Sequence, residues 1–508
     1  MDISSSQILL LACFLLPFLL LFASAKSRRR SAALPPGPPR FPVIGNILDV
    51  GKNPHHSLAD LSKTYGPVMS LKLGNLTTVV VSSPEAAKEV LQVHDQVLSG
   101  RTPSDPVRAI GHHDVSVVWL PASAHWRQLR KILATQLFSP QRLEATKPLR
   151  MNKLRELLGF LGESCSRGEA VDIARSTFVT SLNIISNILF SVDFAGYDSK
   201  ISYEYQDAAV RIMEVAGKPN IADFFPFLGF LDLQGSRKEI KACTERLFRV
   251  FQGFIDARIA KRLTHAGRKD GSSVDLLDSL LDLAQGDKSE LGLKDVKHFL
   301  LDMFLAGTDT SSSTVEWAMV ELLRNPKVMA KAQAEIARVI DPKGVVQESD
   351  IAKLPYLQAV VKETFRLHPP APLLIPRKAE SDVQILGFLV PKNAQVLINV
   401  WAIGRDPNVW ENPMKFEPER FLERETDMKG KDFELTPFGA GRRICPGMPL
   451  ALKTVPLVLA SLLHSFDWKL QNGVVSDHLD MDEAFGVTLH KANPLYAVPV
   501  KKRDVSQI

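Results

Sequence analysis

A single cysteine in a glycine-rich loop constrains this chain more than any other feature. Cys445 lies in the run Phe438-Gly439-Ala440-Gly441-Arg442-Arg443-Ile444-Cys445-Pro446-Gly447, just before an apolar segment, 450–466, that is typical of a helix. The glycines let the backbone turn tightly and bring its N–H groups near the sulfur. The arginines and the helix N-terminus both favour a negative charge there. The loop therefore indicates a thiolate site, which can act as a nucleophile or bind a metal or a haem iron.

The loop alone leaves several roles for Cys445 open. A buried cysteine is most often simply a small apolar side chain. A zinc site is disfavoured because no second cysteine or histidine lies at ligand spacing. A lone axial thiolate on haem fits better, since the porphyrin supplies the iron's other in-plane ligands.

The first residues are typical of a membrane anchor. Segment 8–25 is an almost unbroken apolar run, about long enough to cross a bilayer. Segment 26–30 carries four cations, while only Asp2 is charged before the run, so we expect the following domain to be cytosolic. A cleaved secretory signal is the alternative, since Ala23-Ser24-Ala25 looks like a cleavage site, but its positive leading segment is missing.

Composition narrows the class of protein. The net charge of +6 is spread along the chain without a basic patch with interleaved aromatics, which disfavours nucleic acid as a partner. The four cysteines are widely spaced, form no disulfide framework and suit a reducing compartment. We expect an anchor with a basic stop at 1–30, a proline-rich hinge at 31–50 and a catalytic domain at 51–508.

Two helical stretches carry polar groups in unusual places. Segment 296–325 has helical periodicity, but its middle, Ala306 to Thr314, consists mostly of poor helix formers. Hydroxyl groups there can bond to backbone carbonyls and open the helix; a small-residue contact with another helix is the alternative. Segment 354–367 predicts a second helix, on which Glu363 and Arg366 are three positions apart and can meet.

Other local patterns are weaker by themselves. Trp126 and Arg130 share a helix face, where they can grip a carboxylate or simply stack at the surface. Segments 68–83 and 383–399 predict β-hairpins, the second with its turn at 391–393. His112 and His113 are predicted to be exposed loop residues rather than metal ligands.

Together and in this order, these segments resemble the cytochrome P-450 superfamily, in its plant microsomal form. The cysteine loop matches the haem signature at Phe438, Gly441, Arg443, Cys445 and Gly447. Ala306-Gly307-Thr308-Asp309-Thr310 resembles the oxygen-activation motif. Glu363 and Arg366 resemble the Glu-x-x-Arg pair, with Arg420 as the arginine that joins them, and Trp126 and Arg130 resemble the Trp-x-x-x-Arg motif. The resemblance spans essentially the whole chain.

The resemblance implies the fold and the cofactor. We expect one mainly helical domain with a small β lobe, instead of the three domains that the length suggests, plus one N-terminal transmembrane helix in the endoplasmic reticulum membrane. Heme b is the implied cofactor, with Cys445 as axial thiolate. Loop amides and arginines are expected to keep this thiol deprotonated, and the haem propionates are assigned to Trp126, Arg130, Arg377 and Arg443.

Further roles follow from the same resemblance. Thr310 and Asp309 are expected to deliver protons to bound O2, in a groove opened by Ala306 and Gly307. Glu363, Arg366 and Arg420 are expected to form a buried network. Electrons are expected to come from NADPH through a membrane-bound reductase. The substrate pocket is assigned to Val117, Phe304, Leu305, Ala371, Leu373, Leu374, Phe485 and Val487.

The finer resemblance is to the geraniol 8-hydroxylase group, on stretches such as 116–121, 214–220, 401–406 and 485–489. Because the assigned pocket residues are all apolar, the sequence favours a monooxygenase that hydroxylates a terpenoid such as a monoterpenol or a diterpene. A hydroxylase of a phenolic substrate such as tyrosine is the first alternative. A haem enzyme that rearranges peroxides without a reductase, and a non-catalytic membrane haem protein, are the others.

Overall fold

The computed structural model describes residues 34–264, 275–285, 291–471 and 478–502. The predicted anchor at 1–30 therefore lies outside the described residues. The described part of the predicted hinge is held against the neighbouring sheet. Ser70 donates its backbone N–H to the Pro36 carbonyl at 2.8 Å and its hydroxyl to the Pro35 carbonyl at 2.7 Å. These bonds fix the direction in which the chain leaves the domain.

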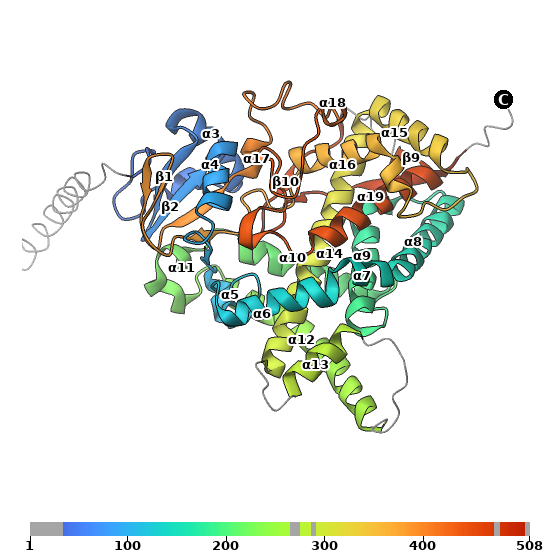
Figure 1. The fold of residues 1–508 in the computed structure, drawn as a ribbon, viewed down its shortest axis with the longest axis horizontal. Coiled ribbons are helices and arrows are strands. Elements are labelled where there is room, and N and C mark those ends of the chain that lie inside the picture. The colour runs from blue at the N-terminus through green and yellow to red at the C-terminus, as the bar shows by residue number, and fades with distance from the viewer. Residues whose placement is uncertain (1–33, 265–274, 286–290, 472–477, 503–508) are drawn as a thin grey trace, which may run out of the picture.

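A five-stranded sheet lies at one end of the molecule (Figure 1). Its order is β1 (Val68–Leu73), β2 (Leu76–Val81), β8 (Gln395–Ile398), β5 (Arg377–Lys378) and β3 (Gly100–Arg101). The first two strands form the predicted hairpin at 68–83, and β8 then pairs with β2 in parallel. The other strands form small sheets: β4 (Val171–Asp172), β12 (Tyr496–Lys501) and β9 (Phe466–Leu470); β6 (Val383–Ile385) and β7 (Phe388–Val390); β10 (Glu483–Ala484) and β11 (His490–Lys491).

The predicted position of the turn in the second hairpin is wrong. Strands β6 and β7 pair across Leu386 and Gly387, both of which have positive φ, and not across segment 391–393. The later half of the predicted hairpin is β8, which joins the five-stranded sheet instead. A leucine at positive φ gives no turn signal in the sequence, since that conformation favours glycine or asparagine.

Helices form most of the fold. Their bounds are α2 (Ile47–Val50), α3 (Pro54–Tyr65), α4 (Pro84–Lys88), α5 (Asp105–Ala109), α6 (Ala124–Ile132), α7 (Pro140–Ala145), α8 (Lys147–Arg167), α9 (Ile173–Phe190), α10 (Lys200–Gly217), α11 (Ile221–Phe224), α12 (Ser236–Thr264), α13 (Leu276–Gln285), α14 (Leu293–Arg324), α15 (Pro326–Val339), α16 (Pro355–Leu367), α17 (Val400–Ile403), α18 (Arg420–Glu423) and α19 (Met448–Ser465). The helices predicted at 296–325, 354–367 and 450–466 are confirmed as α14, α16 and α19.

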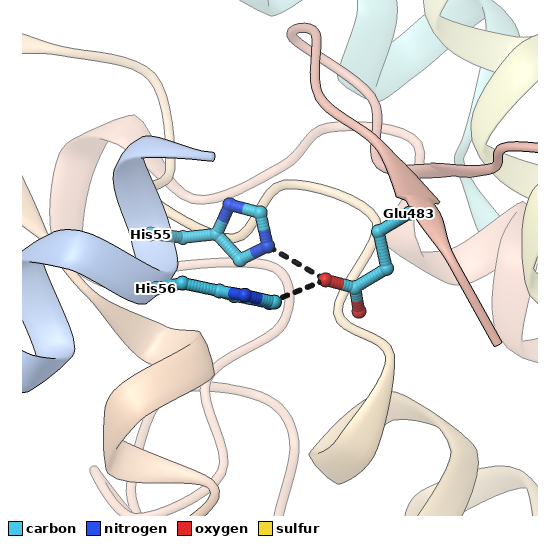
Figure 2. Close-up of side chains that lie close together, drawn as sticks. All are labelled: His55, His56 and Glu483. Atoms are coloured by element: carbon cyan, nitrogen blue, oxygen red, sulfur yellow. Dashed lines mark hydrogen bonds and ion pairs between the residues drawn. The ribbon is translucent and has the colours of Figure 1, made fainter. Parts of the chain in front are cut away.

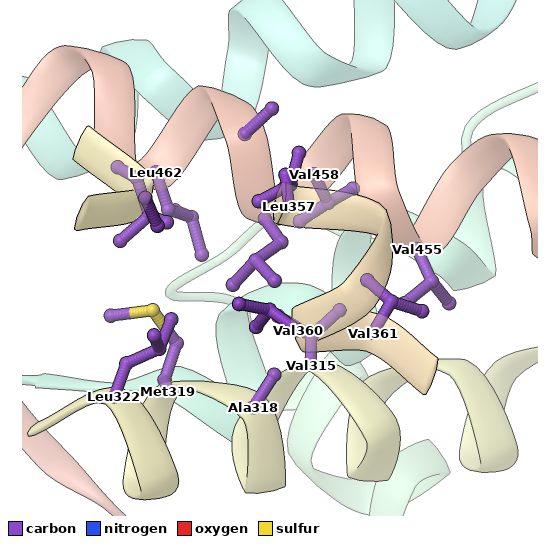
Figure 3. Close-up of a cluster of buried hydrophobic side chains, with 14 of the residues drawn as sticks. Val315, Ala318, Met319, Leu322, Leu357, Val360, Val361, Val455, Val458 and Leu462 are labelled. Atoms are coloured by element: carbon purple, nitrogen blue, oxygen red, sulfur yellow. The ribbon is translucent and has the colours of Figure 1, made fainter. Parts of the chain in front are cut away.

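Helix α14 runs through the centre of the molecule and packs against α9, α12, α16 and α19 (Figure 1). Figure 3 shows its contact with α16 and α19, which is built from Val315, Ala318, Met319, Leu322, Leu357, Val360, Val361, Val455, Val458 and Leu462. Of the described helices, α9 and α19 are long and apolar enough to cross a membrane, but 78% and 67% of their most apolar stretches are buried inside the protein. Their apolar character thus fits core packing.

A buried carboxylate network fixes the loops that follow α17. Arg366 binds Glu363 through two hydrogen bonds, each 2.7 Å long, and both side chains are fully buried. Arg420 adds a bond of 3.1 Å to Glu363, and the backbone N–H of Glu417 donates to the same carboxylate at 2.8 Å. The remaining guanidinium N–H groups of Arg366 donate to carbonyls of Gly404, Pro413 and Lys415.

A second buried network fixes the segment before α6. The Asp302 carboxylate, on α14, accepts from the Ser116 hydroxyl at 2.8 Å and from the Val117 backbone N–H at 2.9 Å. His112 lies 3.0 Å from Asp302 through Nε2 and 2.7 Å from His298 through Nδ1. The prediction that His112 is an exposed loop residue is therefore wrong: it is buried, because residues far along the chain cover it.

Removing the negative charge at the centre of the first network should destabilise the fold. In Glu363→Gln the buried Arg366 loses its counter-charge, and we expect a loss of about 3–5 kcal/mol in the free energy of unfolding. Denaturant-induced unfolding measures the change. The control is Glu434→Gln, which breaks an ion pair whose Arg424 side chain is 56% exposed, and we expect a loss below about 1 kcal/mol. Equal losses in both variants would contradict the network's role.

The second network predicts an acid sensitivity. Burial, and then the charges of His112 and nearby lysines, lower the pKa of His298 from 6.5 to about 3. Between these pH values the unfolded chain binds a proton at His298 that the folded chain excludes. The contribution of His298 to the free energy of unfolding is therefore fully present above pH 6.5 and is lost as the pH falls. We expect His298 to contribute a loss of about 1.4 kcal/mol per pH unit over this range.

Unfolding free energies measured between pH 7 and pH 5 test this expectation. His298→Gln cannot take up the proton and should show a flatter pH dependence than the unaltered protein. His113→Gln, at a half-buried position next to Asp114, should keep the original slope. An unchanged slope in His298→Gln would show that other groups cause the acid sensitivity.

Candidate functional site

The cysteine loop directs the Cys445 thiol at the start of α19. The Cys445 backbone N–H donates to the Phe438 carbonyl at 2.9 Å, which closes the loop, and Phe438 packs edge-on against Phe365 of α16. Gly441 has φ +66°, and a Cβ there would lie 2.1 Å from the Leu91 carbonyl oxygen, so only glycine fits. The sulfur accepts backbone N–H bonds from Gly447 and Met448, in the first turn of the helix.

Burial still raises the pKa of the Cys445 thiol, although the two loop amides and the Arg130 charge act against this rise. The protein groups alone therefore do not hold the thiolate form, contrary to the expectation from the sequence. A bound metal ion would supply the thiolate form, because a coordinated thiol loses its proton. Cys445 as a residue is half-buried.

Four arginines surround the cysteine loop. Arg130 donates to the Ile444 carbonyl at 2.9 Å, and Arg377 donates to the carbonyls of Leu98 and Ala440. Arg443 donates to the carbonyls of Ser99 and Leu120, while its buried Nη1 has no hydrogen-bond partner in the part of the chain that the structure describes. Arg101, which the sequence analysis missed, donates to carbonyls of Val118 and Ile375.

These arginines lack acidic partners within 4.0 Å in the described part of the chain; their hydrogen bonds go to neutral carbonyls. Burial lowers the pKa of Arg377 to about 10, and burial together with neighbouring arginines lowers the pKa of Arg443 to about 10 as well. Burial and the same neighbours also lower the pKa of Arg101. Cations gathered in this way require an anion of more than one charge. Two carboxylates on one ligand, such as the haem propionates, meet the requirement.

Trp126 has a different role from the one predicted. Its indole N–H donates to the Val117 carbonyl at 3.0 Å and is not free for a carboxylate. Its ring instead lies 4.3 Å from the Arg443 guanidinium carbon and 5.7 Å from that of Arg130. Trp126 thereby orients two cations of the cluster through cation–π contacts.

The residues of the predicted oxygen-activation motif on α14 face two different sides of the helix. Ala306 is exposed and Thr310, one turn later, is half-buried; the Thr310 hydroxyl donates to the Ala306 carbonyl at 2.7 Å. The Asp309 carboxylate is buried and lies 3.1 Å from His490 Nε2 through Oδ2, while Oδ1 has no hydrogen-bond partner among the described residues. The Asp309 charge raises the pKa of His490, although burial opposes this rise.

Gly307 does not open the predicted groove. A Cβ at this position would lie 3.0 Å from Ile185 Cδ1, so the glycine lets α9 approach α14. Phe304 precedes Ala306 by two positions, and side chains two positions apart on a helix point in nearly opposite directions. Phe304 therefore faces away from the side on which Ala306 is exposed. Its ring packs with Phe190, Phe194 and Phe251 at centroid distances of 5.7, 5.2 and 5.0 Å, and not in a pocket.

A cavity of about 540 Å³ lies between the five-stranded sheet, α5 and the segment around α11. Of the eight predicted pocket residues, four line it: Leu373, Leu374, Phe485 and Val487. The other four, Val117, Phe304, Leu305 and Ala371, lie outside its lining. Three of these, Val117, Phe304 and Leu305, are buried in the helical core, because tertiary packing decides which side of an element faces the core.

The cavity also has charged lining residues that the sequence analysis missed, and four of them pair with each other. Arg237 binds Asp105 through two hydrogen bonds of 2.6 Å, and Arg108 binds Asp223 at 3.2 Å. The Asp105 backbone N–H donates to Asp223 at 2.5 Å. Burial raises the pKa of Asp223 to about 6. The paired charges join α5 to α11 and α12, and the rest of the wall is largely apolar.

Comparisons with known proteins identify the family of the chain. The sequence model of the cytochrome P-450 family matches residues 35–498. Cytochrome P-450 76C2 of Arabidopsis thaliana is 66% identical over 99% of both chains. Cytochrome P-450 monooxygenase 76AD131 of Lophophora williamsii is 52% identical over 92% of this chain and 93% of its own. Geraniol 8-hydroxylase of Catharanthus roseus is 50% identical over 93% of this chain and 94% of its own.

These matches confirm the predicted resemblance and, with it, the predicted enzyme class and cofactor. The matches extend over nearly the whole chain, and the sequence identities are high enough to show that the chain and its relatives belong to one family. The chain therefore belongs to the cytochrome P-450 family of monooxygenases, which use haem, O2 and NADPH-derived electrons delivered by a reductase.

Proposed function

We propose that this protein is a haem-thiolate monooxygenase that hydroxylates a small lipophilic plant metabolite, a terpenoid such as a monoterpenol or a diterpene. The observation that carries the haem-thiolate part is the half-buried Cys445 thiol beside arginines with no acidic partner within 4.0 Å in the described chain. The proposed location is the endoplasmic reticulum membrane, with 1–30 as anchor, 31–50 as hinge and 51–508 as a cytosolic catalytic domain that receives electrons from a reductase.

Two observations support the terpenoid class. A relative 50% identical to this chain is named geraniol 8-hydroxylase. The cavity offers apolar side chains such as Leu373, Phe485 and Val487, and the charges of Asp105, Arg108, Asp223 and Arg237 are already paired. An amino acid such as tyrosine needs unpaired partners for its carboxylate and ammonium groups, since desolvating them without partners is costly. These observations favour a terpenoid over tyrosine.

The residues around the cysteine loop would hold the cofactor. Bound haem supplies the iron at which O2 is activated. Cys445 would be its axial ligand, in a loop shaped by Phe438, Gly441 and Gly447. The propionates would pair with Arg101, Arg130, Arg377 and Arg443, with Trp126 holding Arg443 in place, and Glu363, Arg366 and Arg420 would keep the loops nearby rigid.

The residues of α14 would handle protons. Thr310 is accessible, and its hydroxyl can exchange the Ala306 carbonyl for a ligand, while the small Ala306 leaves room beside it. Asp309 Oδ1, which has no partner within the described residues, can hold a proton, while His490 orients the carboxylate through Oδ2. Thr310 and Asp309 are not hydrogen-bonded to each other in this structure, so a water molecule or a rotation of the Thr310 side chain must connect them.

The carbon monoxide difference spectrum of the reduced, membrane-expressed protein tests the role of Cys445. We expect the strongly red-shifted band of a thiolate-ligated haem, and its complete loss in Cys445→Ser, because an alcohol does not replace the thiolate. Total haem is measured in parallel, so that loss of haem is distinguished from loss of the ligand.

The control for this spectrum is Cys165→Ser, which alters a half-buried cysteine that packs against the central core. The control should keep the band. A band typical of histidine ligation in the unaltered protein, or one that survives in Cys445→Ser, would refute thiolate ligation by Cys445.

Turnover with a reductase and NADPH tests the substrate class and the role of Thr310. We expect hydroxylated product from geraniol and none from tyrosine. In Thr310→Ala, product formed per NADPH should fall about tenfold or more, with hydrogen peroxide in its place, because a proton donor is lost.

The matched control is Ser311→Ala, which removes the neighbouring hydroxyl and the same kind of bond to a helix carbonyl. It should leave the coupling of NADPH to product unchanged. Oxidation of tyrosine in preference to geraniol would refute the terpenoid class, and unchanged coupling in Thr310→Ala would refute proton delivery by Thr310.

A further inference from the structure

Two histidines and a glutamate converge away from the cysteine loop. His55 and His56 lie in the first turn of α3, and Glu483 lies in β10, more than 400 positions later in the chain. Figure 2 shows both imidazole rings directed at the same carboxylate oxygen. His55 Nε2 is 2.8 Å and His56 Nε2 is 2.7 Å from Glu483 Oε2.

The cluster is built into the protein and open on one side. The His55 side chain is fully buried, Glu483 is 7% exposed and His56 is 41% exposed. Trp401 packs against both histidine rings, and its indole N–H lies 3.4 Å from Glu483 Oε1, which leaves Oε2 for the histidines. The side chains are thus ordered on the inner side, while an ion in solution can reach them past His56.

These donors have the chemistry of a transition-metal site. Two imidazole nitrogens and a carboxylate oxygen are ligands of zinc, which commonly has three protein ligands and one water molecule at an open site. Among the described residues, no other group of three or more such side chains has its ligand atoms within 4.8 Å of one another.

The charges nearby leave Glu483 available for a cation. Arg405 interacts electrostatically with Glu483, and its guanidinium carbon lies 3.8 Å from the centre of the Trp401 ring. Glu321 also acts on Arg405 and so offsets part of its charge. His368, whose Nδ1 lies 4.0 Å from Glu483 Oε1, is itself bonded to Glu321 at 2.8 Å.

We propose that His55, His56 and Glu483 bind one divalent transition-metal ion of the zinc class. A tetrahedral ion with bonds of about 2.0–2.1 Å holds its ligand atoms about 3.3 Å apart, so each histidine nitrogen must withdraw about 0.5 Å from Glu483. The partly exposed His56 has space for this shift. Without the ion, the carboxylate accepts N–H bonds from both rings.

The site lies next to the cavity. The His55 ring stacks on Phe485 at a centroid distance of 5.4 Å and an interplanar angle of 14°, and Phe485 lines the cavity. Since Glu483 and Phe485 are two residues apart, an ion bound by α3 and β10 restrains the segment that carries Phe485 and Val487. Metal occupancy is thereby linked to the shape of the cavity wall.

Zinc binding to the full-length, haem-loaded protein tests the proposal. After treatment with a chelator, the protein is dialysed against zinc, and bound zinc and haem iron are counted separately by elemental analysis. We expect one zinc ion more per chain in the unaltered protein than in His56→Ala or Glu483→Gln, whose affinity for zinc should be at least about tenfold weaker.

The choice of variants separates a metal site from a hydrogen-bonded cluster. Glutamine at 483 keeps an oxygen that accepts from both rings but removes the charge that a zinc ion needs. The control is His94→Ala, which alters a histidine 3.2 Å from Glu89 with similar exposure but no third ligand, and it should bind zinc like the unaltered protein.

A second measurement protects the test against misfolding. The thermal midpoint should rise with zinc in the unaltered protein and in His94→Ala, but not in the two site variants. The haem spectrum confirms that each variant is folded. Equal zinc binding by all four proteins, or binding by none of them, would overturn the proposal and leave the cluster as a hydrogen-bonded tether.

Discussion

The arginines around the cysteine loop are the constraint on which the rest of the site depends. Arg130 and Arg377 lie close enough to lower the pKa of both Arg101 and Arg443, and the hydrogen bonds of all four side chains go to neutral carbonyls. Cations collected without an anion cost free energy, whereas a ligand with two carboxylates converts this cost into affinity. In the proposed arrangement haem would bring both those carboxylates and a cation for Cys445, so haem binding and the stability of this region would be linked.

Buried carboxylates connect the rigid helices to the irregular segments around the site. Asp302 accepts the Val117 backbone N–H, Glu316 that of Leu495, and Glu363 that of Glu417. Glu335 does the same for Tyr356 and Leu357 at the start of α16. Loops carry backbone donors that a helix or sheet would satisfy, and an acid on a neighbouring helix satisfies them instead. The long helices thus define where these loops lie.

The sequence predicted well what depends on neighbouring residues. The bounds of α14, α16 and α19 follow from periodicity and from proline or glycine near their ends, and each predicted end lies within three residues of the observed one. The hairpin of β1 and β2 follows from a glycine–asparagine pair between β-rich runs. Motif spacing also brought Glu363, Arg366 and Arg420 together, because two of them share a helix face.

The predictions that failed concern contacts between residues that are far apart in the chain. Nothing near Phe304 says that its face of α14 meets Phe190 and Phe251, and nothing near His112 says that Asp302 covers it. Arg101 was missed because a single arginine in a two-residue strand has no pattern of its own. A side chain's burial is decided by tertiary packing, which periodicity describes only for the element on which the residue lies.

The cavity shows how such long-range pairing determines chemical selectivity. Its lining includes Asp105, Arg108, Asp223 and Arg237, which by composition suggest a polar ligand. Each charge is matched by another across 115 or more positions of the chain, so a ligand meets few unsatisfied charges and many apolar carbons. A polar ligand gains affinity only if it displaces one of these pairs and leaves a partly buried partner uncompensated. A lipophilic ligand avoids that cost, and this difference is the physical basis on which the cavity favours lipophilic over charged ligands.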